Sequence, residues 1–239
     1  MIMDSTGKLF LIPTPLGDNP PLEVLPISVK KATELIDYYI VENEKTARRF
    51  IKKINQSKVQ SELKIKVLNK YTSDEEIIDF LDPCLEGNNV GLLSEAGCPG
   101  VADPGSEIVK LAHNKCIEVV PLSGPSSIIL ALMSSGMNGQ NFAFNGYLPI
   151  ENVKRKSAIK KLEKLSFEKN QTQIFIETPY RNDKMLEELC KNLNENTRLC
   201  VAVDVTLPTE KILSLTMKLW KKRKIELHKR PAIFLIHKD

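Results

Sequence analysis

The sequence predicts an α/β protein built from two α/β domains. Short apolar runs alternate along the chain with segments whose apolar residues recur at helical spacing. Two Gly/Pro-dense loops, Gly91–Gly105 and Val119–Ser127, lie between such runs and helical segments. Loops of this kind at strand ends form the ligand crevice of an open α/β sheet. After the second loop the pattern changes, because strands then follow one another with less helix between them, which indicates a second domain.

The first domain is expected to contain a mostly parallel, doubly wound sheet. Its strands are predicted from short buried runs at Leu9–Ile12, Tyr38–Val41, Ile65–Leu68, Val90–Leu93 and Ile117–Val120. The helices between them are predicted at Glu23–Leu35, Lys45–Ile54, Asp74–Leu85 and Gly105–Ala112. Ser73 and Glu76 have the spacing of a capping box at the start of the third helix. Regular alternation of strand and helix favours parallel pairing.

The second domain is expected to contain a mixed sheet. Its helices are predicted at Ser126–Ser134, Asn152–Leu165 and Lys184–Leu193. Its strands are predicted at Phe142–Phe144, Gln173–Ile176, Arg198–Val203, Lys211–Leu215 and Ala232–Ile236. The last strands are separated by too little chain for a helical crossover at every step, so antiparallel pairs are expected among them. A boundary near Pro121 gives domains of residues 1–121 and 122–239.

Composition limits the classes of protein to consider. The chain has 239 residues, 42% of them hydrophobic, and a formal net charge of +4. No apolar run reaches the ~20 residues that span a bilayer, and Met1–Lys8 lacks the pattern of a signal peptide, so we expect a cytoplasmic protein with no membrane partner. The five cysteines are scattered without a CxxC pair, which argues against a disulfide framework and a zinc site.

Common nucleotide and hydrolase signatures are missing. The chain contains neither G-x-G-x-x-G nor G-x-x-x-x-G-K-[ST], and no serine lies in a G-x-S-x-G elbow. The three histidines, at 113, 228 and 237, are too dispersed for a local metal motif, so no metal is expected. Lys218–Lys224 with Lys229 and Arg230 is a basic segment around Trp220. It could contact RNA phosphates and stack a base, or it could be a solvated helix end.

Five loop motifs carry a family resemblance. They are Ile12-Pro-Thr-Pro-Leu-Gly17, Leu93-Ser-Glu-Ala-Gly-Cys-Pro99, Asp103-Pro-Gly105, Pro121-Leu-Ser-Gly-Pro-Ser126 and Phe144-Asn-Gly-Tyr-Leu-Pro149. In this order they resemble the tetrapyrrole methylase superfamily of S-adenosylmethionine-dependent methyltransferases, and within it the small-subunit ribosomal RNA 2′-O-methyltransferase I branch. Glu177–Arg181 and Pro231–Phe234 resemble elements of the family's second domain, so the resemblance covers nearly the whole chain.

The resemblance implies a methyltransferase that binds S-adenosylmethionine in a cleft between two α/β domains, as a homodimer, with ribosomal RNA as a partner. By position it implies cofactor contacts from Pro15, Leu16, Gly17, Gly97, Cys98, Val101, Ser126, Ser127, Glu177, Thr178, Pro231 and Ala232. A ribose hydroxyl acceptor needs a group that helps remove its proton. The candidates near substrate are Glu44, Lys45, Glu95 and Arg181, with Glu42 as a further acid, and no single catalytic residue stands out.

The sequence departs from the ribosomal RNA branch where substrate would be contacted. Val41–Thr46 replaces an Ala-Glu-Asp-Thr-Arg element, Asn69–Asp74 lacks a His-Glu pair, and Ser94–Gly97 reads Ser-Glu-Ala-Gly instead of Ser-Asp-Ala-Gly. The C-terminal extension of longer members is also missing. Two alternatives therefore remain open: a methyltransferase acting on a tetrapyrrole or another small molecule, and a non-catalytic S-adenosylmethionine-binding module.

Overall fold

The computed structural model describes residues 6–69 and 71–238. Residues 1–5 of the Met1–Lys8 segment, Lys70 of the Asn69–Asp74 segment, and Asp239 lie outside the described residues. The chain divides into two compact units, Met1–Ser126 and Ser127–Asp239, each with a five-stranded sheet. Each unit is described below by itself.

The N-terminal unit is built on a sheet whose strand pairs are all parallel. Its strands are β1 (Leu9–Ile12), β2 (Tyr38–Val41), β3 (Lys64–Val67), β4 (Val90–Leu93) and β5 (Val119–Pro121). They are arranged in the order β3-β2-β4-β1-β5. The three internal strands, β2, β4 and β1, are nearly continuous apolar runs, as expected for strands buried on both faces. The predicted parallel, doubly wound sheet is confirmed.

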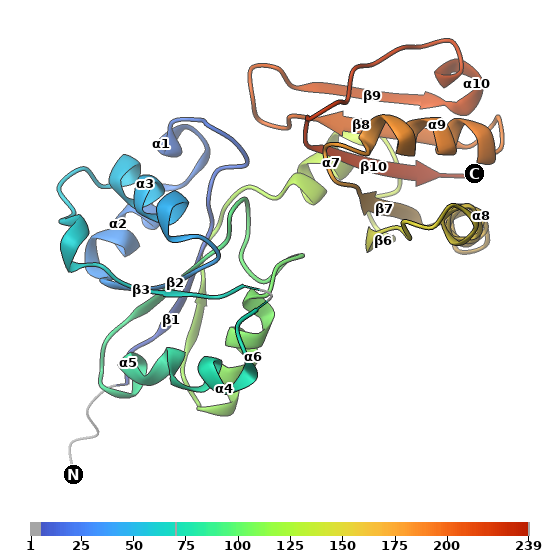
Figure 1. The fold of residues 1–239 in the computed structure, drawn as a ribbon. Helices are drawn as coiled ribbons and strands as arrows, with labels where there is room; N and C mark the ends of the chain where they lie inside the picture. The colour runs from blue at the N-terminus through green and yellow to red at the C-terminus, as the bar shows by residue number, and fades with distance from the viewer. Residues whose placement is uncertain (1–5, 70, 239) are drawn as a thin grey trace. The chain divides into compact units, whose positions relative to one another are not determined.

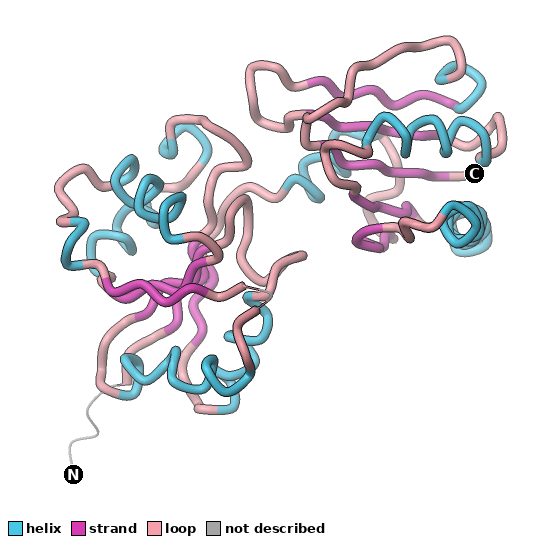
Figure 2. Tube along the Cα trace, viewed as in Figure 1, coloured by secondary structure: helices cyan, strands magenta, loops and turns pink. Residues whose placement is uncertain are grey.

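Helices cover both faces of this sheet. One layer holds α1 (Pro21–Val24), α2 (Ile27–Leu35) and α3 (Glu44–Ile54), and the other holds α4 (Asp74–Ile77), α5 (Asp82–Leu85) and α6 (Gly105–Asn114). Figures 1 and 2 show these two layers with the strands between them. Val29 and Ile51 are fully buried in the core of the first layer, and Ile108 is fully buried in the core of the second. The crossover direction therefore changes after β3, which matters for the location of the site.

Two predicted helices are broken in the structure. The Glu23–Leu35 segment is divided at Pro26 into α1 and α2, because the residue before a proline is pushed out of the helical region. Leu25 is accordingly extended, with φ −113° and ψ 138°. The Asp74–Leu85 segment begins at the predicted Ser73 capping box, but it tightens into a 3₁₀ turn at Ile78–Leu81 before α5. A short 3₁₀ turn, Gln60–Glu62, also precedes β3.

The C-terminal unit contains the predicted mixed sheet. Its strands are β6 (Phe142–Tyr147), β7 (Thr172–Ile176), β8 (Arg198–Val203), β9 (Lys211–Thr216) and β10 (Ala232–His237), in the order β6-β7-β10-β8-β9. Only the β6–β7 pair is parallel, because the long α8 (Asn152–Lys169) crosses over between these strands. The other pairs are antiparallel.

Helices pack on opposite faces of this second sheet. Apolar residues of α8, α9 (Asn182–Asn192) and α10 (Met217–Trp220) share one core with alternate residues of the strands, including Leu199 and Val201. Cys200, between them in β8, pairs with Ser214 of β9, whose hydroxyl donates to the Ser135 carbonyl of α7 (Ser127–Ser135) at 2.6 Å. Because paired residues share a face, α7 lies on the other side of the sheet.

Among the described residues, no helix is long and apolar enough to cross a membrane. The five cysteines are all free thiols.

Candidate functional site

Three loops of the N-terminal unit meet beyond the carboxyl ends of β1, β4 and β5. Thr14 and Gly97 form an isolated antiparallel bridge, in which the Thr14 N–H donates at 3.0 Å and the Gly97 N–H donates back at 3.1 Å. The Cys98 thiol donates to the Pro125 carbonyl at 3.5 Å. The loops that the sequence marked by their glycines and prolines are therefore neighbours in the folded unit.

Glycine is required at two contacts between these loops. Gly97 has φ +78°, and a Cβ there would lie 3.2 Å from both a Leu16 methyl carbon and the Pro125 carbonyl oxygen. A Cβ on Gly124 would lie 2.2 Å from the Pro13 Cβ, which is an impossible overlap. The close approach of main chain from three loops thus depends on missing side chains. We call this convergence of main chain the glycine cradle; the contacts that form it are made by main chain and uncharged side chains.

A pocket of about 460 Å³ opens at this edge of the sheet. It lies between the loop after β1, the end of β4 and one face of α3, and its lining includes Pro15, Leu16 and Gly17. The chain leaves β1 and β2 toward the α1–α3 layer, whereas it leaves β4, which lies between them, toward α6. Such a change of direction is where open α/β sheets bind ligands, and the pocket volume is in the range of small-ligand sites.

Acidic side chains gather at the same edge. Glu42 follows β2, and its carboxylate accepts the N–H of Glu95, which follows β4, at 3.0 Å. The Thr46 hydroxyl donates to the Glu95 carboxylate at 2.5 Å. Burial raises the pKa of the Glu42 carboxyl; the Glu95 N–H opposes this, and the carboxylates of Asp103 and Glu95 reinforce it. The arrangement offers a carboxylate that can accept a proton beside the pocket.

The loop after β4 is closed on itself by Asp103. Its carboxylate accepts the N–H groups of Gly100 and Gly105, both at 2.8 Å. Burial raises the pKa of the Asp103 carboxyl, and these two hydrogen bonds oppose the rise. Val101 lies at the outer turn of the loop with 49% of its surface exposed. The exposed valine thus sits on a loop whose backbone is fixed from within.

The site residues expected in the C-terminal unit also form a group. Glu177 follows β7, and its side chain is only 2% exposed. Its carboxylate accepts the Thr178 N–H at 2.6 Å and pairs with the Arg181 guanidinium at 2.6 Å. The antiparallel pairing of β7 with β10 places Ala232 next to this turn, because Ile176 is in register with Ile233.

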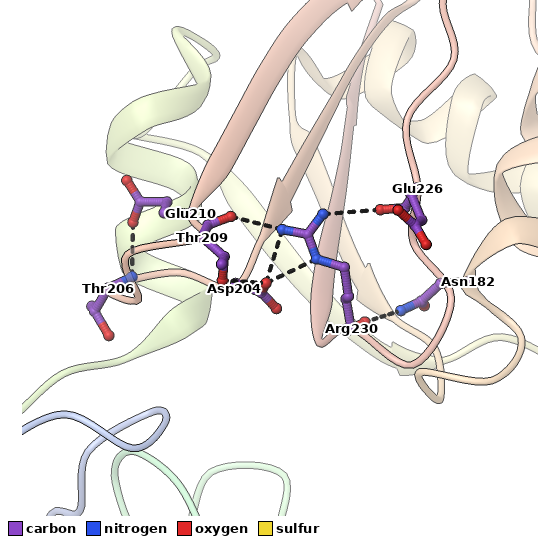
Figure 3. Close-up of polar contacts among 7 residues, drawn as sticks. All are labelled: Asn182, Asp204, Thr206, Thr209, Glu210, Glu226 and Arg230. Carbon is purple, nitrogen blue, oxygen red and sulfur yellow. Dashed lines mark hydrogen bonds and ion pairs between the residues drawn. The ribbon is translucent and has the colours of Figure 1, made fainter.

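Arg230 fixes the loop that leads into β10 (Figure 3). Its guanidinium donates to the buried Asp204 carboxylate at 2.8 Å and to the Thr209 carbonyl at 2.7 Å. Its own carbonyl accepts the Asn182 side-chain amide at 2.7 Å, and the Pro231 carbonyl accepts the Asp204 N–H at 3.0 Å. From the sequence, Arg230 is predicted only as one cation of the basic segment. Its partner Asp204 is 26 residues away, and no local sequence pattern indicates that the two residues pair.

The basic segment of the C-terminal unit differs from its expected form. Trp220 is 1% exposed, and its indole N–H donates to the Leu199 carbonyl at 2.7 Å. The prediction that an RNA base could stack on Trp220 is therefore wrong, because the ring is part of the core. Lys221 pairs with Glu195 at 2.8 Å, while Lys222 and Arg223 are exposed. Only the charges of this segment remain available to a partner.

The predicted substrate residues are placed in different surroundings. Glu95 lines the pocket, whereas Glu44 pairs with Arg48 at 2.7 Å and, like Lys45, is not part of the pocket lining. Arg181 lies in the C-terminal unit with Glu177. Ser126 ends the N-terminal unit and Ser127 begins α7. Within the described part of the chain, no cluster of His, Cys, Asp and Glu could hold a metal ion.

Sequence reasoning missed the face of α3 that forms one wall of the pocket. The lining residues on this helix are Thr46, Ala47, Arg49, Phe50 and Lys53. Their spacing of three and four residues is the signal that could have revealed them, since it places them on one side of a helix. The Gly/Pro-rich loop after β1, on the opposite wall, is what that side of the helix faces.

A comparison with protein families decides the assignment. Residues 22–219 match the family described as Tetrapyrrole (Corrin/Porphyrin) Methylases. The chain belongs to this family. It is thereby a methyltransferase of the S-adenosylmethionine-dependent class, as the loop motifs implied. The match spans both compact units, so neither sheet is an unrelated addition.

Three relatives of this tetrapyrrole methylase family member carry the same name. The chain is 27% identical over 209 residues to the ribosomal RNA small subunit methyltransferase I of Vibrio cholerae, covering 87% of this chain and 68% of the relative. It is 28% identical over 209 residues to the protein of that name from Escherichia coli O157:H7, covering 87% and 69%. A third, from Buchnera aphidicola, is 26% identical over 98% of this chain and 79% of the relative.

Two solved structures of methyltransferases share this fold. The methyltransferase CobJ superposes with a TM-score of 0.65 at 16% identity, covering 97% of this chain and 94% of that chain. Cobalt precorrin-4 methyltransferase CbiF superposes with a TM-score of 0.61 at 18% identity, covering 99% and 97%. At these identities the likeness establishes the fold, which confirms two α/β domains with a parallel and a mixed sheet.

Proposed function

We propose that this chain transfers a methyl group from S-adenosylmethionine to a ribose 2′-hydroxyl of small-subunit ribosomal RNA. The observation that carries the proposal is the similarity, over 87% of the chain, to relatives named ribosomal RNA small subunit methyltransferase I. The pocket chemistry supports it, because a hydroxyl acceptor needs a proton acceptor. Glu95 lines the pocket, and the carboxylate of Glu42, outside the lining, accepts the Glu95 N–H.

The residues of the N-terminal unit fit this cofactor. A sulfonium is a soft cation that is destabilised by nearby cationic side chains and accommodated by carbonyl dipoles and apolar surface. The glycine cradle, where main chain from three loops converges, supplies such surroundings. Proposed cofactor contacts are Pro15, Leu16, Gly17, Gly97, Cys98, Val101 and Ser126 from this unit, with Ser127, Glu177, Thr178, Pro231 and Ala232 from the other.

Catalysis by this chain then consists of positioning and proton removal. When bound, the cofactor supplies an electrophilic methyl carbon. The main chain of the Gly97 loop holds its position, and the apolar surface of Leu16 keeps water away. Glu42 or Glu95 accepts the proton that the ribose hydroxyl loses, and burial raises the pKa of the Glu42 carboxyl, which strengthens it as a base. Neither step requires a metal ion or a covalent enzyme intermediate.

Several remaining expectations belong to this proposal. The substrate side is assigned to Glu44, Lys45, Glu95 and Arg181, and the exposed cations of residues 222–224 add electrostatic attraction for RNA.

A homodimer in the cytoplasm is the form that the family resemblance implies. Light scattering at several concentrations tests the dimer, and a mass equal to one chain throughout would contradict it.

The deciding experiment is methyl transfer to native small ribosomal subunits. Cofactor with a labelled methyl group is incubated with subunits that lack this modification, and the ribosomal RNA is digested to nucleosides. A labelled 2′-O-methylnucleoside is expected when the protein has its own sequence, without substitutions. Glu42→Gln and Glu95→Gln, prepared separately, are expected to lower the rate about 10²-fold or more for whichever carboxylate is the base. Label on a base or no label would refute ribose methylation.

A second function is favoured by one specific observation. Val41–Thr46 and Asn69–Asp74 depart from the ribosomal RNA branch, and the fold is shared with a cobalt precorrin-4 methyltransferase. Methylation of a tetrapyrrole or another small molecule is thus the alternative acceptor chemistry. Absorbance titration with uroporphyrin would detect such an acceptor. Tight cofactor binding with no transfer to RNA, tetrapyrroles or cell extract would instead indicate a non-catalytic binding module.

A further inference from the structure

One face of α3 is directed at the pocket beside the proposed cofactor loops. Thr46, Arg49 and Lys53 line the pocket from this helix, and Phe50 lies between them as the apolar part of the wall. With a rise of ~1.5 Å per residue, Arg49 lies ~4.5 Å and Lys53 ~10.5 Å further along the helix axis than Thr46. The wall therefore carries a hydroxyl at one end and two cations toward the other.

The cations of α3 differ in whether they have partners. Arg48 pairs with Glu44 and donates to the Gln60 carbonyl, so its charge is used within the fold. Lys53 pairs with Asp18 of the opposite wall at 2.5 Å. Arg49 is exposed, and among residues 6–69 and 71–238 its guanidinium has neither a hydrogen bond nor an ion pair. Its charge does act on the Asp18 carboxyl, whose pKa is lowered by the Lys53 ammonium first and by Arg49 to a smaller extent. The pocket thus contains a planar cation whose N–H groups are not used by a hydrogen bond within the described residues.

The charges divide the pocket into two ends. Glu95, held by the Thr46 hydroxyl, makes the end near the start of α3 acidic. Toward the other end, the cations of Arg49 and Lys53 face the single carboxylate of Asp18, which leaves that end with a net positive charge. An anion is repelled from the first end and attracted to the second, whereas a neutral hydroxyl is tolerated beside the carboxylate. A ligand that carries both groups a short distance apart is held in one orientation.

We propose that Arg49 is the anchor for a backbone phosphate of the acceptor, and that the pocket takes one nucleotide of single-stranded RNA with its ribose toward Glu95. This inference rests on the proposed function and assigns the substrate side of that site to a particular wall. A guanidinium donates two parallel hydrogen bonds to a phosphate, which an ammonium does not. A pocket of about 460 Å³ has room for one nucleotide but not for a duplex, and unpaired RNA is the form whose nucleotides can be splayed into pockets.

Binding without turnover tests the inference. The probe is a fluorescein-labelled single-stranded oligouridylate of eight nucleotides, and affinity is followed by anisotropy at several salt concentrations. Arg49→Gln is expected to weaken binding about tenfold, the low end for a charge-assisted hydrogen bond. The slope of log K against log salt should fall by about 0.7, the value for one contact to a single strand. The affinity of Arg49→Gln for S-adenosylmethionine, measured by calorimetry, should stay unchanged.

Two controls make the result specific. Lys52→Gln removes one cation from the same helix, but Lys52 is not part of the pocket lining, and its ammonium instead donates to the Gln56 carbonyl. This variant should change RNA affinity less than twofold. A second probe carries methylphosphonate linkages in place of the phosphodiesters. With that neutral backbone, Arg49→Gln and the unmodified chain should bind equally.

Three outcomes would overturn the anchor. Equal losses for Arg49→Gln and Lys52→Gln would mean that only total charge matters. A loss that persists with the neutral probe would remove the phosphate from the contact. A loss for uroporphyrin, an octacarboxylate, without a loss for RNA would assign the wall to a carboxylate-bearing small molecule. Failure of the proposed function looks different, because there the unmodified chain transfers no methyl group to ribosomal RNA, whatever the oligonucleotide binding shows.

Discussion

Thr14 and Gly97 are joined by two main-chain hydrogen bonds, at 3.0 and 3.1 Å, although 83 positions of chain separate them. This bridge ties the loop after β1 to the loop after β4, at the point where the crossover direction of the sheet changes. The proposed cofactor loops are consequently held by hydrogen bonds of the backbone, which every residue type except proline can make. Side chains at the bridge are constrained mainly by the space they occupy.

Replacing Gly97 with alanine should damage cofactor binding more than stability. The residue has φ +78°, a conformation that costs an L-residue about 1–2 kcal/mol, and the new Cβ would press on Leu16 and Pro125. We expect at least tenfold weaker S-adenosylmethionine binding by calorimetry and a lower melting temperature. Gly139→Ala is the matched control, since nothing lies within 4 Å of its added Cβ. Unchanged cofactor affinity in Gly97→Ala would remove this loop from the site.

Replacing Arg230 with glutamine should destabilise the C-terminal unit. The Asp204 carboxylate, 8% exposed, would lose its cation, and a buried charge left without its partner costs about 1–3 kcal/mol after allowing for the partly exposed arginine. Urea unfolding followed by circular dichroism measures the loss. Lys229→Gln changes the neighbouring, exposed cation and should stay within about 0.5 kcal/mol. If the two variants unfold alike, Arg230 does not fix the loop before β10.

Replacing Glu42 with glutamine should raise stability at neutral pH while lowering activity. Because the pKa of the folded carboxyl is raised, the stabilising contribution of Glu42 is present below the unfolded pKa of ~4.3 and is lost as pH rises through the folded value. Glutamine keeps an oxygen for the Glu95 N–H without the buried charge. The melting temperature of Glu42→Gln should exceed that of the unmodified chain at pH 7.5, and the difference should shrink toward pH 4. A variant less stable at pH 7.5 would contradict this reasoning.

Trp220, the single tryptophan of the chain, should report on folding and not on RNA contact. Its ring is buried and its N–H is bound to Leu199, so we expect blue-shifted emission that iodide quenches poorly. Saturating single-stranded RNA should leave the emission unchanged. Trp220→Phe should cost about 1–3 kcal/mol, because the Leu199 carbonyl loses a donor in the core. Strong quenching by RNA would restore base stacking as an explanation of the basic segment.

Much of the fold was predictable because local patterns and burial agreed. The strands at Leu9–Ile12, Tyr38–Val41 and Val90–Leu93 have the predicted bounds, since buried parallel strands are continuous apolar runs between clear loop signals. Pro26 by itself indicates a break in the Glu23–Leu35 helix. The apolar residues around it recur at helical spacing, and this pattern favours one continuous helix. Boundaries near Ile65 and Ile117 moved by one or two residues, because hydrogen-bond register decides strand ends.

The candidate site was predictable only where chain order sets spatial order. Parallel strands end at one edge of a sheet, so the sequence alone placed the loops after β1, β2, β4 and β5, which include Glu42 and Glu95, at that edge. Which side of α3 faces the pocket, the pairing of Arg230 with Asp204, and the burial of Trp220 depend on packing between distant segments. The sequence by itself determined the two sheets, the glycine loops and the family, because each is written in short-range pattern. Only the tertiary structure decided which cations remain unpaired, because a charge is free or used according to the partners that folding places beside it.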